Sequence, residues 1–305
     1  MQIDERLSHP SRRQFGIELM LAAAATTVPG RLFAADAVRP KHKICAFVKF
    51  LQKLDYEQLA DAIAAAGYDG VEVTAREKEG YIHPSVAADE LPKLQEALAK
   101  RDLEITILTT DILRADQPHA QKLLQTAAEL QIPRYRLGFY RYDLKQPILK
   151  QLAELQPTIQ EIAAMNRDLG IAAVYQNHCG ADFFGATLWD LHSLIKDYPV
   201  SEIGCVFDIR HAAVEAGEAW PQLYNLMEPH ISAVSVKDYV WDGQKSQHAP
   251  LGKGRVDPKF FSLMEESGFD GPISVHVEYL PQGSTEENLQ ALKTDLNTLK
   301  ELLST

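Results

Sequence analysis

The sequence has few cysteines, no basic cluster after its first forty residues and no long apolar run in its main body. Its 3 cysteines are an odd number, so at least one is unpaired. The formal net charge of −11 argues against binding of nucleic-acid phosphates, which requires clustered Lys and Arg. Beyond the N-terminal region, no segment approaches the roughly 18 apolar residues that span a bilayer. The expected partner is therefore a small polar molecule and not a nucleic acid.

The sequence also lacks a glycine-rich loop that would cradle phosphates after an early strand of a doubly wound sheet. Residues 49–53, which cover the end of the first predicted strand and the residues after it, contain no glycine. Gly252 and Gly254 come late, in a long loop, and do not continue as G-x-G-x-x-G. We therefore predict no dinucleotide site.

The cysteines are interpreted mainly as structural residues. Cys45 and Cys205 lie in predicted buried strands, where a thiol behaves as a small apolar side chain. Cys179 follows His178 in a loop. A nucleophilic role for it is the alternative, but no acyl-transfer constellation accompanies it.

The first forty residues have the pattern of an export signal. Arg12 and Arg13 precede an apolar run over residues 17–28, and small residues around Ala34, Ala35 and Ala37 offer a cleavage site. Paired arginines before a weakly hydrophobic run are typical of a twin-arginine signal, which exports folded proteins. An ordinary Sec signal and an uncleaved membrane anchor are the alternatives. We expect an export signal over residues 1–37, one domain over residues 38–305, and a mature periplasmic protein free of the membrane.

Short β-rich runs alternate eight times with helical patterns along the rest of the chain. Most of these runs are continuously apolar, as expected for parallel strands that are covered on both faces. Eight β/α units in about 260 residues predict an α/β fold, a closed (β/α)8 TIM barrel. The predicted strands cover residues 44–50, 70–74, 104–109, 134–139, 171–176, 202–208, 231–237 and 273–278, and the predicted helices cover residues 56–66, 91–101, 119–130, 148–169, 188–197, 219–227, 258–267 and 285–303.

Polar residues follow most of these strands, at the end where a TIM barrel carries its chemistry. Buried carboxylates and imidazoles need partners, because an unpaired charge in a low dielectric is costly. A divalent cation would satisfy several of them at once. The side chains expected at this end are Glu72, Asp111, Gln176, His178, Asp208, His211, Lys237, Asp238 and Glu278.

Six short motifs, in their order and spacing, resemble a known superfamily. They are residues 67–73 (GYDGVEV), 176–178 (QNH), 207–212 (FDIRHA), 236–238 (VKD), 250–254 (PLGKG) and 273–278 (ISVHVE). Over essentially the whole predicted domain, the chain is similar to the xylose-isomerase-like TIM-barrel sugar phosphate isomerase/epimerase superfamily. Its members include ketose 3-epimerases, inosose dehydratases, 3-keto-glycoside lyases and endonuclease IV.

The resemblance implies one divalent metal, Mn, Mg, Zn or Co, held by a Glu, an Asp, a His and a Glu on the fifth to eighth strands. Asp208 and Glu278 match the second and fourth ligands, but Gln176 and Ser235 stand where the first Glu and the His would be. Metal affinity is expected to fall, and a site without metal is the alternative. The expected metal ligands are Gln176, Asp208, Glu278, His211 and His248.

The chemistry that the resemblance implies is proton abstraction next to the carbonyl of a keto-sugar or glycoside. Such a reaction needs a cation or donors for the anionic oxygen and a base for the proton. We expect Lys237 to assist as a cation and Glu278 or His178 to act as the base. The residues expected to bind the sugar are His211, Glu72 and Trp241.

Elimination, dehydration or one-sided isomerisation is preferred over epimerisation with two bases, because the uncharged Gln176 cannot take a proton. A degenerate barrel that binds carbohydrate without turning it over is the main alternative. Endonuclease activity is the weakest option, since the acidic chain lacks several of the ligands that three zinc ions need. A homodimer with a contact loop over residues 140–147 is a further possibility.

Overall fold

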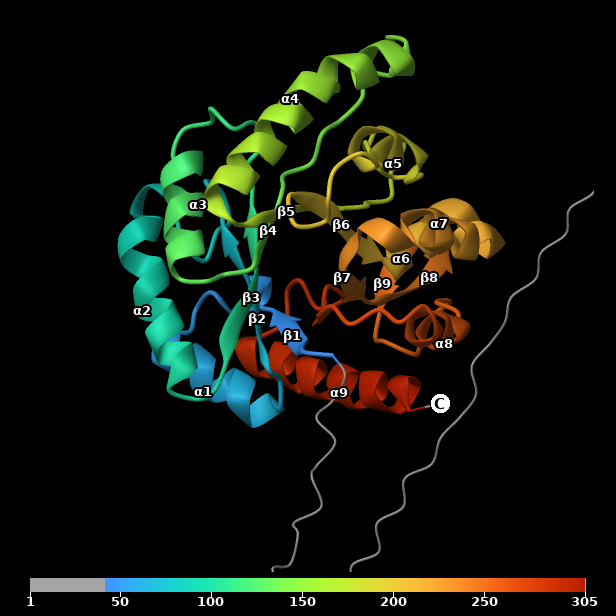
Figure 1. Ribbon diagram of the computed structural model, residues 1–305. Coiled ribbons are helices and arrows are strands. Elements are labelled where there is room, and N and C mark those ends of the chain that lie inside the picture. The colour runs from blue at the N-terminus through green and yellow to red at the C-terminus, as the bar shows by residue number, and fades with distance from the viewer. Residues whose placement is uncertain (1–41, 305) are drawn as a thin grey trace, which may run out of the picture. The chain divides into compact units, whose positions relative to one another are not determined.

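The computed structural model describes residues 42–304, so the predicted export signal lies outside the described residues. Eight parallel strands close into a barrel in the order β1-β10-β7-β6-β5-β4-β3-β2, and helices surround them (Figure 1). The predicted (β/α)8 TIM barrel is confirmed. The barrel strands are β1 (Ile44–Phe47), β2 (Gly70–Ala75), β3 (Glu104–Thr110), β4 (Arg134–Arg136), β5 (Ala172–Gln176), β6 (Ile203–Asp208), β7 (Ile231–Val236) and β10 (Ile273–Val275).

The helices begin and end at residues whose chemistry favours a helix terminus. Asp55 and Ser284 each form a capping box with the third residue of the following helix. Gly67 and Gly170 end two helices in the left-handed conformation that glycine adopts without strain. The α-helices are α1 (Tyr56–Ala66), α2 (Ala87–Ala99), α3 (Ala120–Glu129), α4 (Ile148–Leu169), α5 (Trp189–Ile195), α6 (Ile209–Ala216), α7 (Trp220–Met227), α8 (Lys259–Glu266) and α9 (Thr285–Leu303).

Short 3-10 turns complete the pattern of helices. They lie at the ends of longer helices or between a strand and the next helix. These turns are η1 (Lys49–Leu51), η2 (Pro84–Val86), η3 (Gly217–Ala219) and η4 (Glu228–His230). Within the described residues, no helix is both long and apolar enough to cross a membrane.

A hairpin that the sequence analysis did not predict follows β7. Strands β8 (Asp238–Asp242) and β9 (Lys245–Ala249) pair antiparallel. The Asp238 carboxylate accepts four backbone N–H bonds, including those of Gly252 and Gly254, at 2.8 to 3.1 Å. A Cβ at Gly254 would lie 2.2 Å from that carboxylate, so the loop closes around Asp238 only with glycine there. Asp238 therefore shapes the loop over the barrel mouth.

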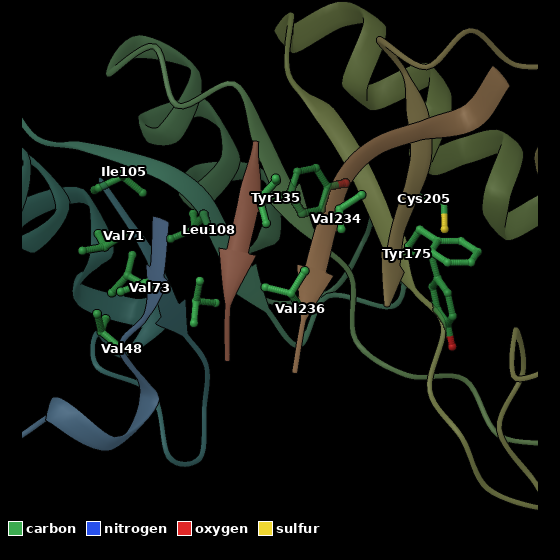
Figure 2. Close-up of a cluster of buried hydrophobic side chains, with 14 of the residues drawn as sticks. Val48, Val71, Val73, Ile105, Leu108, Tyr135, Tyr175, Cys205, Val234 and Val236 are labelled. Atoms are coloured by element: carbon green, nitrogen blue, oxygen red, sulfur yellow. The ribbon is translucent and has the colours of Figure 1, made fainter. Parts of the chain in front are cut away.

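Strand alternation divides the core into an outer layer and a barrel interior. Val71 and Val73 of β2 and Val234 and Val236 of β7, which are labelled in Figure 2, belong to the larger hydrophobic core cluster. The residues between them point into the barrel. Its interior holds a smaller apolar cluster formed by Cys45, Ile107, Val174, Val206 and Ala233.

The interior cluster fixes which side chains reach the mouth. Because side chains two residues apart share a face of a strand, Gln176 follows Val174 one layer higher and Asp208 follows Val206. Lys237 follows β7 directly, and Glu278 lies three residues after β10. The predicted 134–139 strand ends early, at Arg136, because the Gly138 N–H turns to the Ile112 carbonyl.

Candidate functional site

A buried ammonium group joins two carboxylates at the carboxyl end of the barrel. Lys237 Nζ lies 2.6 Å from Glu278 Oε2 and 3.1 Å from Asp208 Oδ2. The side chains of Lys237, Asp208 and Glu278 are 4%, 0% and 20% exposed. Burial disfavours the charged amine, but the two carboxylates outweigh it and raise the pKa of Lys237. Lys237 is thus held charged at one position.

Gln176 connects this ion pair to a second one deeper in the barrel. Its amide lies 2.7 Å from Asp208 Oδ2 on one side and 2.7 Å from Arg136 Nη1 on the other. A carboxylate only accepts and a guanidinium only donates, so the amide nitrogen must face Asp208 and the oxygen must face Arg136. The orientation of Gln176 is therefore set by its two neighbours.

Glu72 is the anionic centre of the deeper network. Its carboxylate accepts from Thr109 and Ser274 at 2.6 Å each, and it lies 3.0 Å from Arg136 and 2.9 Å from His276. Burial would raise the pKa of Glu72, but the charges of His276 and Arg136 outweigh it and lower that pKa. Both oxygens of Glu72 already contact protein groups, so its predicted contact with sugar stays a prediction.

Two residues hold the Asp208 backbone and side chain in place. The Asn177 amide accepts from the Asp208 N–H at 2.7 Å and donates to the Asp208 carbonyl at 3.1 Å. The Asp208 carboxylate also caps helix α6 by accepting from the His211 N–H at 3.1 Å. Asp208 thus stands at a strand end and a helix start at once, which fixes the carboxylate toward Lys237.

His178 presents one defined proton-accepting nitrogen. Its Nδ1 lies 3.0 Å from the Cys179 carbonyl, which only accepts, so Nδ1 carries a proton. Burial and the charge of Lys237 lower the pKa of His178 to about 4. The ring is therefore neutral at pH 7 and its lone pair is on Nε2. Phe183 stacks against the ring with centroids 4.3 Å apart and fixes its plane.

In His211 the two ring nitrogens have the opposite roles: Nδ1 accepts a hydrogen bond and Nε2 carries the proton. Its Nδ1 lies 3.0 Å from Arg210 Nη1, a donor, so Nδ1 accepts and the proton is on Nε2. That Nε2–H is buried and has no hydrogen-bond partner among the described residues. It lies 3.7 Å from Asp208 Oδ2, and its ring centroid is 4.0 Å from that of His178. The two histidines thus offer one acceptor and one free donor.

The remaining predicted residues lie on the hairpin. His248 of β9 lies opposite Tyr239, and burial lowers the pKa of His248 to about 4. Its Nδ1 is buried without a partner among the residues that the structure describes. Trp241 is 43% exposed and lines an open cavity of about 840 Å³ with Tyr239, Arg255 and Asp257. Lys237 is not among the residues that line this cavity, and the contact of Trp241 with sugar stays a prediction.

The predicted metal ligands do not fit a divalent ion as they stand. Gln176 turns its oxygen to Arg136, and Lys237 Nζ lies between the two carboxylates that would hold the ion. His178, Cys179 and His211 form a second group whose ligand atoms lie within 4.8 Å of one another. There, Arg210 Nη1 is 2.8 Å from Cys179 Sγ and bonds His211 Nδ1, so a cation already contacts two of the three ligands.

Arg136 and Arg210 are site residues that the sequence analysis missed. Both are buried, with 3% exposure each, and both bond groups of the mouth. The sequence did contain a signal, because each arginine stands at a position that should be buried. Arg136 lies within a predicted strand, and Arg210 stands between Asp208 and His211. A buried guanidinium requires acceptors, so each position indicated a polar interior.

Comparison with known proteins agrees with this architecture. A search of curated proteins finds no match. Among solved structures, a D-tagatose 3-epimerase-like protein has a TM-score of 0.66 at 18% identity, over 86% of this chain and 96% of that one. A 3-keto-D-glucoside 4-epimerase from E. coli has a TM-score of 0.65 at 12% identity, over 84% of this chain and 99% of that one. A probable 3-DHS dehydratase from Bacillus anthracis has a TM-score of 0.64 at 14% identity, over 85% of this chain and 98% of that one.

These structural likenesses, at such low identities, show the fold. The family follows from a match of residues 60–302, most of the barrel, to the model of one protein family. The chain belongs to the xylose isomerase-like TIM barrel family.

Proposed function

We propose that the protein is an enzyme that removes a proton next to the carbonyl of a keto-sugar or glycoside, leading to elimination, dehydration or isomerisation. The observation that carries the proposal is the Lys237 ammonium, which is fixed between Asp208 and Glu278. Two neighbouring histidines offer one acceptor nitrogen and one donor N–H. Its family and its structural neighbours, which include sugar epimerases and a dehydratase, support a sugar as the substrate.

Lys237 supplies the stabilisation that the weak carbon acid needs. A C–H bond beside a ketone ionises only when the oxygen that takes the charge meets a cation or a donor. Lys237 is charged, 4% exposed and held by two carboxylates, so it needs little reorganisation to meet that oxygen. The free His211 Nε2–H provides a second donor in the same region.

His178 is the base that the geometry favours. Its Nε2 lone pair is unprotonated at neutral pH, whereas the Glu278 carboxylate is bonded to Lys237 at 2.6 Å. Burial would raise the pKa of Glu278, but Lys237 outweighs it and lowers that pKa far below its usual range. Glu278 is therefore the weaker base until substrate draws Lys237 away from it.

The proposed step conserves atoms and charge. His178 Nε2 takes the proton, the C–H electron pair becomes a carbon–carbon double bond, and the carbonyl oxygen takes the negative charge beside Lys237. In an elimination, the carbonyl then re-forms, a new double bond forms between the deprotonated carbon and the next carbon along, the bond from that next carbon to its leaving oxygen breaks, and His178 returns the proton to that oxygen. One base on one face of the sugar suffices, which agrees with the uncharged Gln176.

Solvent-deuterium exchange tests the proposal. The full-length protein is incubated in D2O with a panel of ketoses and 3-keto-glycosides, and proton NMR follows the C–H groups beside the carbonyl. We expect exchange or product formation with at least one compound. His178→Gln is expected to slow it about a hundredfold or more, as for loss of a general base.

The controls distinguish the alternatives. Gln125→Glu, on the exposed face of α3, should leave the rate unchanged. If Glu278→Gln abolishes exchange and His178→Gln does not, Glu278 is the base. Saturable sugar binding without exchange or product for any compound would contradict the proposal and favour a carbohydrate-binding barrel.

A further inference from the structure

We infer that the mouth of this barrel takes no divalent ion, and that the Lys237 ammonium occupies the place between Asp208 and Glu278 where the family resemblance implies one. The part of this inference that concerns catalysis without metal rests on the proposed function. The part that concerns metal binding is about the protein without substrate and can be tested separately.

The first argument is that three of the four carboxylate oxygens of Asp208 and Glu278 already contact protein donors. Asp208 Oδ2 accepts from Gln176 Nε2 at 2.7 Å and contacts Lys237 Nζ at 3.1 Å. The other oxygen, Oδ1, caps helix α6 through the His211 N–H at 3.1 Å. Glu278 Oε2 is bonded to Lys237 at 2.6 Å. An ion placed between Asp208 Oδ2 and Glu278 Oε2 would have to displace the ammonium.

The second argument is electrostatic repulsion. An ion that bonded both oxygens would lie close to the amine that already contacts them, and its +2 charge would repel the +1 charge of Lys237. The alternative is for Lys237 to leave. That would separate a side chain that is 4% exposed from both of its carboxylates. Either route opposes metal binding.

The third argument is the direction of the Gln176 amide. Its oxygen faces Arg136, which is itself held by Glu72 at 3.0 Å. Turning the oxygen toward an ion would point the amide N–H groups at the Arg136 guanidinium, two donors without an acceptor. Ser235 adds no ligand charge, and its hydroxyl lies 3.3 Å from His276 Nε2.

His211 does not replace the missing ligands. His211 accepts from Arg210 through Nδ1 and carries its proton on Nε2, so neither nitrogen has a lone pair to offer. For Nε2 to bind an ion, the proton would have to move to Nδ1, where it would face Arg210 at 3.0 Å. Arg210 therefore excludes His211 as a ligand in the same way that Lys237 excludes an ion from the carboxylates.

Metal uptake by the full-length protein tests the inference without substrate. The protein is incubated with excess Mn²⁺ or Co²⁺, dialysed against metal-free buffer and analysed for its metal content. We expect no stoichiometric ion in the native protein, and no loss of deuterium exchange after chelator treatment. One retained ion per chain that Asp208→Asn abolishes would overturn the inference.

A double substitution tests whether Lys237 and Gln176 are the residues that exclude the ion. Gln176→Glu with Lys237→Ala supplies a third carboxylate and removes the ammonium, so it should gain one Co²⁺ per chain with a visible absorption spectrum. Gln125→Glu with Lys237→Ala is the matched control and should gain none. Circular dichroism confirms folding; if the double variant does not fold, the native measurement decides. A folded double variant that binds no ion would overturn the assignment of the exclusion to Lys237 and Gln176.

Discussion

Gln176→Glu tests whether the hydrogen bonds of the Gln176 amide to Asp208 and Arg136 stabilise the fold. The substitution replaces the N–H donor that lies 2.7 Å from Asp208 Oδ2 with a carboxylate oxygen. At that distance and an effective dielectric of about 20, two unit charges repel by about 6 kcal/mol. The new charge gains attraction to Arg136, which offsets part of the repulsion. The hydrogen bond to a charged acceptor, worth about 1.5 to 3 kcal/mol, is lost outright.

The variant can avoid the repulsion by binding a proton between the two carboxylates. Holding a Glu protonated costs about 1.4 kcal/mol per pH unit above its ordinary pKa of about 4.3. This route would cost about 5 kcal/mol at pH 8 but only about 1.6 kcal/mol at pH 5.5. Because the folded variant binds the extra proton, its stability relative to the native protein should rise as the pH falls. We expect a loss of about 2 to 4 kcal/mol at pH 8 and about 1 to 2 kcal/mol at pH 5.5.

Urea denaturation at the two pH values, in metal-free buffer, measures both losses. The matched control is Gln125→Glu, where the same substitution places a carboxylate beside Glu129, at an amide-to-carboxylate distance of 3.1 Å, on the exposed face of α3. Water and salt screen that pair, so its cost should stay within about 0.5 kcal/mol at either pH. A Gln176→Glu variant as stable as the control at pH 8 would refute this stabilisation.

Two further predictions concern the scaffold of the site. Burial raises the pKa of Asp295 to about 7, so the folded state keeps a proton that the unfolded state releases above about pH 4, and stability falls as the pH rises toward 7. Asp295→Asn should therefore stabilise the protein by about 1 to 2 kcal/mol at pH 8 and by less at pH 5, measured by thermal denaturation. Gly254→Ala would place a Cβ 2.2 Å from Asp238, so it should cost about 2 kcal/mol or more in urea denaturation. The control Gly243→Ala meets no atom within 4 Å and should cost about 1 kcal/mol, from its positive φ alone.

The fold was predictable because local signals and the barrel pattern agree. Helix α1 begins at the Asp55 cap and ends at Gly67, and α9 begins at the Ser284 cap, where the sequence placed them. The β8–β9 hairpin was missed because β8 is short and β9 has only one apolar residue, Ala249, so neither strand has the apolar pattern of a barrel strand. Its shape depends on Asp238 binding a distant loop, which no local pattern reveals.

The site was predictable in its location but not in its connections. The position of Gln176, Asp208 and Glu278 at strand ends predicted that they lie at one end of the barrel, and the structure joins them through hydrogen bonds and Lys237. That Gln176 turns its oxygen away from the mouth could not be predicted, because Arg136 comes from another strand, forty residues earlier. Donor and acceptor partners across strands decide such orientations.

The rate at which solvent deuterium enters a keto-sugar beside its carbonyl, compared between the native protein and Lys237→Met, tests the central claim most directly. The methionine keeps an unbranched side chain one atom shorter and removes the charge, and circular dichroism verifies that the variant folds. The fixed ammonium predicts a rate about a hundredfold to a thousandfold lower in the variant, the usual cost of removing an oxyanion donor. An unchanged rate in folded Lys237→Met would contradict it.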